Sequence, residues 1–119
     1  MGVNNGWEVF YTTMRAAVRS QETLQTRLEY VVMIVYSLSS RDHFPSDEAW
    51  ERFETLKRAT TRLPARFEGE GTLHATTSQM TDAEAGTLLE LCFDIFNEMA
   101  KAAGAEDYRF SLAVKHDEN

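Results

Sequence analysis

Carboxylates at helical spacing are the side chains in this sequence best suited to chemistry. They form two series: Glu48, Glu51 and Glu54, three residues apart, and Glu90, Asp94 and Glu98, four apart and called the acidic stripe below. If both series converged, they could hold a divalent cation, and the chain would be a metal-dependent nucleotide hydrolase. On a helical wheel, however, the acidic stripe lies opposite the apolar stripe that contains Cys92. No metal-binding residue is therefore predicted, and the hydrolase stays an alternative.

The acidic stripe is either a solvated helix face or a candidate interaction surface. Its members are like-charged neighbours on a helix, and only Lys101 is placed to relieve them. Such pairs cost roughly a few tenths of a kcal/mol each, which a merely solvated face would tolerate. The functional interpretation is that the stripe meets a basic surface. Arg15 and Arg19 are a second like-charged pair, and they could face the stripe within the bundle or across a dimer.

Histidine and cysteine chemistry has little support in this sequence. His43, His74 and His116 fall in three separate regions outside the expected helices, and none belongs to a paired ligand pattern. Cys92 lies on an apolar helix face, where a thiol is expected to be buried and inert. No phosphate-binding loop, dinucleotide fingerprint or G-x-S-x-G motif occurs. No catalytic residue and no cofactor are predicted, which favours a non-enzymatic role.

Charge is distributed unevenly along the chain, which has a net charge of −7. Residues 1–44 are neutral, residues 45–66 carry +1, and residues 67–119 carry −8. An acidic half suits a basic protein partner and argues against general binding to a nucleic-acid backbone. The alternative is a small helical subunit of a nucleoprotein assembly that contacts nucleic acid through the basic series Arg52–Arg66.

Apolar residues at helical spacing predict four helices, at about residues 7–19, 21–39, 46–63 and 81–104. Ser20 and Ser46 are suitable N-caps for the second and third helices. Thr81 and Glu84 match a capping box at the start of the fourth. Pro64 should end the third helix, because proline cannot continue one.

The second predicted helix is apolar on two sides. One stripe runs from Leu24 to Leu38, and Tyr30, Met33 and Tyr36 lie nearly opposite. A helix that is apolar all round must be covered on every side. We therefore predict a dimer interface at Tyr30, Met33 and Tyr36. The β-branched run 31–35 could alternatively form a buried strand.

Two segments do not match a helical pattern. Residues 66–77 contain Gly69 and Gly71 and are expected to form a short hairpin or a loop. Residues 108–115 alternate between apolar and polar side chains, which is typical of a half-buried strand. The predicted fold class is mainly α: a four-helix bundle-like single domain over residues 1–119, with a possible small β-hairpin or C-terminal strand.

The remaining composition indicates a cytoplasmic protein. No apolar run approaches the roughly 18 residues of a membrane span, and the first residues do not resemble a signal peptide. A single cysteine excludes an internal disulfide. We therefore expect a small acidic protein-interaction module of the adaptor or inhibitor type. It should bind a protein partner with a basic surface, and form a homodimer.

Overall fold

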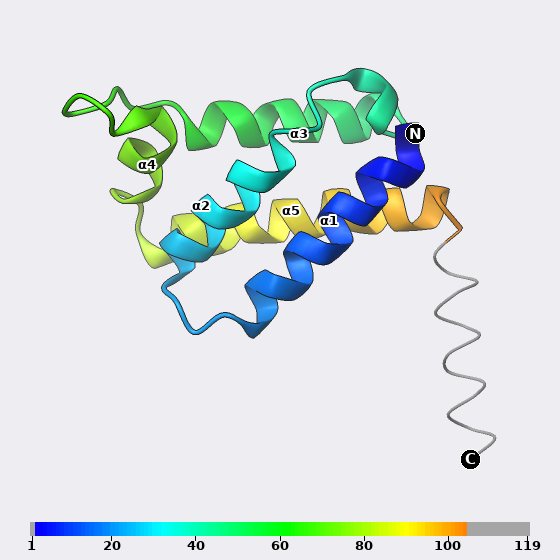
Figure 1. Ribbon diagram of the computed structural model, residues 1–119, viewed down its shortest axis with the longest axis horizontal. Helices are drawn as coiled ribbons and strands as arrows, with labels where there is room; N and C mark the ends of the chain where they lie inside the picture. Colours follow the sequence, from blue (N-terminus) through cyan, green and yellow to red (C-terminus); the bar gives the residue numbers. More distant parts are fainter. Residues whose placement is uncertain (1, 105–119) are drawn as a thin grey trace, which may run out of the picture.

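The computed structural model describes residues 2–104, with side chains from residue 5 onward, and this part of the chain is mainly helical. Its elements are α1 (Gly2–Arg19), α2 (Leu24–Val35), the 3₁₀ turn η1 (Arg41–His43), α3 (Asp47–Thr60), α4 (Gly71–Thr77) and α5 (Asp82–Ala102). In Figure 1, α3 runs along the top, α4 closes the left end, and α1 and α2 cross in front of α5. Since α5 contacts α1, α2 and α3, it sets the positions of the other long helices.

The N-caps of α3 and α5 are those that the sequence predicts. Ser46 Oγ accepts a hydrogen bond from the Ala49 amide at 3.1 Å. Thr81 and Glu84 form the capping box: the Thr81 hydroxyl accepts from the Glu84 amide at 3.1 Å, and the Glu84 carboxylate accepts from the Thr81 amide at 2.9 Å. Each bond satisfies an amide that has no partner inside its own helix. These two helix starts are therefore fixed locally.

The second predicted helix is too long at both ends. Its N-cap is Thr23 rather than Ser20, whose hydroxyl instead accepts from the Glu22 amide before the helix begins. The helix ends at Val35, and Leu38 follows it as a buried residue in the connection to η1. The segment is helical, so the strand alternative for residues 31–35 is wrong.

The hairpin or loop predicted for residues 66–77 is wrong over Gly71–Thr77, which form α4. Tertiary contacts explain this short helix, since Ala75, Thr76 and Thr77 are buried. The Thr76 hydroxyl also accepts a 2.9 Å hydrogen bond from the Leu63 amide and so ties α4 to the chain after α3. The predicted strand at residues 108–115 lies outside the described residues.

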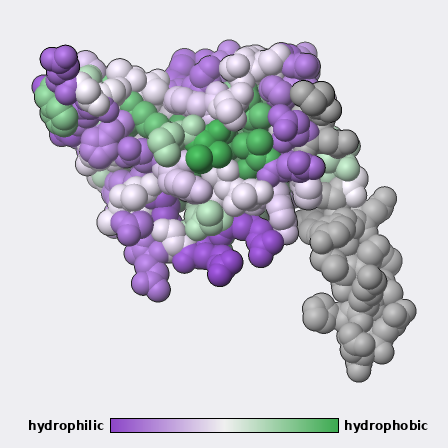
Figure 2. All heavy atoms as spheres, in the orientation of Figure 1, coloured by the Kyte–Doolittle hydropathy of each residue, from purple (hydrophilic) through white to green (hydrophobic). Residues whose placement is uncertain are grey.

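The core gathers side chains from every helix, with large aromatic residues at one end. Phe44 stands 4.7 Å from Phe53 and 5.3 Å from Trp50, measured between ring centroids. The core also contains Phe10 of α1 and the α5 residue Ile95, both fully buried. Figure 2 shows hydrophobic atoms reaching the surface between α2 and α3, within a mostly hydrophilic face. Burial of these side chains is the main favourable term in folding.

Gly6 is a point of close approach between α1 and its neighbours. A Cβ at this position would lie 2.6 Å from the carbonyl oxygen of His43, and closer still to the terminal methyl of Met99. Gly86 of α5, by contrast, has only Leu24 Cδ1 at 4.0 Å. Two glycines inside helices therefore face opposite steric conditions.

We expect Gly6→Ala to destabilise the fold by about 1–3 kcal/mol, because the added methyl group must displace backbone. The matched change Gly86→Ala should stabilise it by up to about 1 kcal/mol through helix propensity. Urea denaturation of both variants measures the two effects. Equal changes in the free energy of unfolding would contradict the close approach of α1 to η1.

The capping box predicts a pH-dependent stability term. The hydrogen bond from the Thr81 amide lowers the pKa of Glu84, so ionised Glu84 stabilises the folded state. This stability is present above the unfolded-state pKa of about 4.3 and is lost as pH falls through the lower folded-state pKa. Glu84→Gln should be less stable than wild type near neutral pH, and the gap should close in acid. A gap independent of pH in urea titrations would argue against the ionised cap.

Candidate functional site

The acidic stripe divides into two parts in the structure. Glu90 and Asp94 are exposed on α5, and neither forms an ion pair with another described residue. Glu98 is half-buried and pairs with Arg52 of α3, and the Ser46 hydroxyl lies 3.5 Å from its carboxylate. Glu98 therefore links α5 to α3, and we call the remaining exposed pair, Glu90 and Asp94, the acidic ridge.

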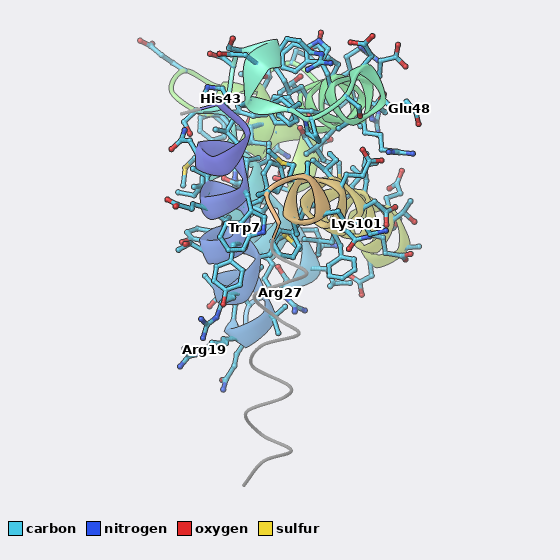
Figure 3. All side chains as sticks on the ribbon, turned by 90° about the vertical axis from the view of Figure 1, so that its right-hand side faces the viewer. Trp7, Arg19, Arg27, His43, Glu48 and Lys101 are labelled. Atoms are coloured by element: carbon cyan, nitrogen blue, oxygen red, sulfur yellow. The ribbon has the colours of Figure 1, made fainter. Side chains whose placement is uncertain are left out.

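Arg15 and Arg19 do not pair with the acidic ridge inside the described part of the chain. Arg15 donates a 3.2 Å hydrogen bond to the Tyr11 hydroxyl, and its guanidinium lies 5.5 Å from the centre of that ring. Arg19 extends from the far end of α1 (Figure 3). Within the described residues the intramolecular arrangement expected from the sequence is not formed, and a contact across a dimer stays a prediction.

Phe93 is the residue of this surface that the sequence analysis missed. Its side chain is 55% exposed, although phenylalanine is usually buried. On α5 it lies about 60° from Glu90 on the helical wheel, on the side that faces α1. The available signal was that Phe93 falls outside the buried stripe of Cys92, Ile95 and Met99. An exposed aromatic ring thus stands directly beside two unpaired carboxylates.

A groove of about 380 Å³ separates α1 from α5 beside Phe93. Its lining residues are Tyr11, Met14, Arg15, Val18 and Arg19 from α1, and Phe93 and Phe96 from α5. Val18, at 76% exposure, is the most open of its apolar residues. The groove is therefore apolar along its floor, with arginines on the α1 rim and the acidic ridge beside the α5 rim.

Aromatic contacts hold the floor of this groove in place. Trp7 stacks on Tyr11 with centroids 5.0 Å apart, and Tyr11 lies 6.2 Å from Phe96. Phe96 in turn lies 6.2 Å from Phe93. Figure 3 shows Trp7 between α1 and α5. Stacked and tilted rings of this kind contribute about 0.5–1.5 kcal/mol per pair beyond their buried area, so the floor is preorganised.

The predicted dimer interface on α2 is only partly exposed. Tyr30 and Met33 are 41% and 56% exposed, and Ile34 joins them at the surface. Tyr36 instead turns toward α3, where its hydroxyl lies 3.0 Å from Thr60 Oγ1, and burial raises its pKa. The three predicted residues therefore do not share one open face.

Basic and histidine side chains are largely engaged within the chain. Arg66 pairs with Glu70 beside α4, and Lys57 lies 3.8 Å from Glu54. His74 Nδ1 lies 2.8 Å from the carboxylate of Glu29, which joins α4 to α2. His43 belongs to η1, and His116 lies outside the described residues. Over residues 2–104, no three His, Cys, Asp or Glu side chains are grouped to hold a metal ion.

Comparison of the chain with protein-family models, with curated proteins and with solved structures finds no match. Among the helices described, none combines the length and apolar character that crossing a membrane requires. The surface of α1 and α5 must therefore be interpreted from its own geometry.

Cys92 is fully buried in the core, as the sequence predicts, and burial raises the pKa of its thiol to about 12. Since the thiolate is the reactive species, Cys92 should resist alkylation by iodoacetamide at pH 8 in the folded protein and react after unfolding in urea. Mass spectrometry measures the extent of labelling. Rapid labelling of the native protein would contradict the packing of α5.

Proposed function

We propose that this chain is a small, cytoplasmic, non-enzymatic interaction module that binds a protein with a basic surface through the exposed face of α5. One observation carries the proposal: Phe93 is 55% exposed beside Glu90 and Asp94, and neither carboxylate has a cationic partner among the described residues. An exposed aromatic ring at an apolar groove, with charged residues around it, matches the apolar centre and polar rim of protein interfaces.

The free energies expected for an aromatic contact and for exposed ion pairs assign different roles to Phe93 and to the two carboxylates. Exposed ion pairs are worth about 0–1 kcal/mol each, so Glu90 and Asp94 supply steering and selectivity more than affinity. An aromatic side chain that enters a pocket on the partner contributes more, and such anchors dominate measured interfaces. Phe93 is therefore the proposed anchor, and the acidic ridge selects a partner that carries lysine or arginine around the receiving pocket.

The nucleic-acid alternative has weaker support. Its surface, the basic series from Arg52 to Arg66, has ion pairs at both ends, with Glu98 and with Glu70. Arg58 and Arg62 remain exposed between them, which is a small positive area for a phosphate backbone. Salt-sensitive retention of the purified protein on single-stranded or double-stranded DNA would favour this alternative over protein binding.

The proposal predicts which proteins the immobilised chain no longer retains when the α5 surface is altered. Immobilised wild-type chain should retain a basic protein that both Glu90→Lys/Asp94→Lys and Phe93→Ala fail to retain. The matched control is Glu51→Lys/Glu68→Lys, which makes the same change of net charge at exposed residues elsewhere. Quantitative mass spectrometry of the retained proteins identifies candidates, and calorimetry with the purified candidate measures affinity.

The expected loss of affinity is at least tenfold for Phe93→Ala, with a smaller loss for the charge reversal that grows as salt is lowered. If the control variant loses the same proteins, binding reflects net charge alone and the α5 surface is not a specific site. If all variants retain the same proteins as wild type, the proposed function is wrong.

A further inference from the structure

The α1–α5 groove has arginines on one rim and acidic residues just outside the other. Arg15 and Arg19 stand on the α1 side, while Glu90 and Asp94 stand on α5 beyond Phe93. None of the ion pairs among the described residues joins the two rims. The charges are thus separated by the apolar floor instead of neutralising each other, and both rims remain available to an occupant.

The two rims are also in register along the groove. The α1 residue Gly6 lies against Met99, Tyr11 lies against Phe96, and Val18 lines the groove together with Phe93. These contacts show that α1 and α5 run in opposite directions. The arginines of α1 therefore lie at the same height along the groove as the end of α5 that bears the acidic ridge.

We propose that the occupant of this groove is a second copy of the chain, related to the first by a two-fold axis parallel to the groove. Such an axis places the α1 rim of each copy against the α5 rim of the other, at the same height. Arg15 and Arg19 then meet Glu90 and Asp94 twice, once on each side of the axis. A two-fold axis across the groove at this height would instead oppose the two arginine pairs to each other and the two acidic ridges to each other, so these four residues favour the parallel axis.

Two further charged residues, one on each helix, extend this pattern of opposite charges. Glu8 is exposed on α1, seven residues before Arg15 and on the same side of the helix. Lys101 is exposed on α5, seven residues after Asp94, and Figure 3 shows it near the C-terminal end of α5. The charge on α1 and on α5 thus reverses toward the end where Gly6 approaches Met99, and the proposed axis again brings opposite charges together.

The apolar floor gives this dimer its binding energy. Val18 and Phe93 are 76% and 55% exposed in the single copy, and Met14 lies between them and Tyr11 in the groove lining. The paired copies would cover these side chains against each other and remove their apolar surface from water. The same contact covers Phe93 and the acidic ridge, so the dimer and the proposed basic partner would compete for one surface.

Mass in solution tests the dimer without any partner protein. We expect wild type to approach twice the 13.6 kDa of one copy as concentration rises from micromolar to millimolar. Arg15→Glu/Arg19→Glu and Glu90→Lys/Asp94→Lys should each stay monomeric in sedimentation equilibrium. An equimolar mixture of the two variants should recover the doubled mass, because each seam of the mixed dimer then pairs opposite charges.

Several outcomes would overturn the inference. One is a wild-type chain that stays monomeric at millimolar concentration, and another is a mixture of the two variants that does not regain the dimer. Circular dichroism and urea denaturation must first show that each variant is folded. Loss of the dimer in Glu51→Lys/Glu68→Lys would attribute the effect to net charge and would also overturn it. Loss of the dimer only in Tyr30→Ser/Met33→Ser would show that the interface lies on α2 instead.

The readouts separate this inference from the proposed function. Failure of the mass experiment leaves capture of a basic protein by Phe93 and the acidic ridge untouched. Failure of the capture experiment, in turn, does not affect the doubled mass expected for the mixture of the two variants. If both hold, the affinity of the basic partner should fall as the concentration of the chain rises, since the dimer covers its site.

Discussion

Burial of one side of α5 is the constraint on which the rest of the surface depends. Cys92, Ile95 and Met99 are fully buried against neighbouring helices. Because a helix turns about 100° per residue, fixing that side fixes the direction of every other side chain on α5. The acidic ridge must then face solvent, and Phe93 must lie at the edge toward α1. The proposed binding surface is in this sense a consequence of the core, and the capping box at Thr81 fixes the residue at which α5 begins.

Local signals in the sequence predicted the starts of α3 and α5 correctly and the tertiary details poorly. Ser46 and Thr81 could be identified as N-caps because their hydrogen bonds join residues only three apart. The short helix α4 could not, since its stability comes from burial and from the long-range bond between Leu63 and Thr76. Propensity alone does not stabilise a helix of seven residues in water, so only packing decides it.

The residues of the candidate site also divide into those that a local pattern predicts and those that a long-range contact places. A helical wheel was enough to predict that Glu90 and Asp94 point outward, whereas the inward position of Glu98 depends on Arg52, which is 46 positions away in sequence. Likewise, Tyr36 was placed on an exposed face because nothing local reveals the Thr60 hydroxyl that receives it. Phe93 was within reach of sequence reasoning, because it is the large apolar residue of α5 that falls between the buried stripe and the acids.

Charge and apolar area act at different stages of recognition on this surface. Rim charges act over about 8–10 Å at physiological salt, so they select an approach direction before contact is made. Apolar side chains such as Phe93 and Val18 act only once water is expelled, so they determine how long the complex lasts. The proposed basic partner and the proposed second copy would both bring positive charge to α5 first and apolar contact second. Under the two proposals, the arginine rim of α1 presents the same kind of surface as the basic partner, so the occupant would depend on the concentration and the affinity of each.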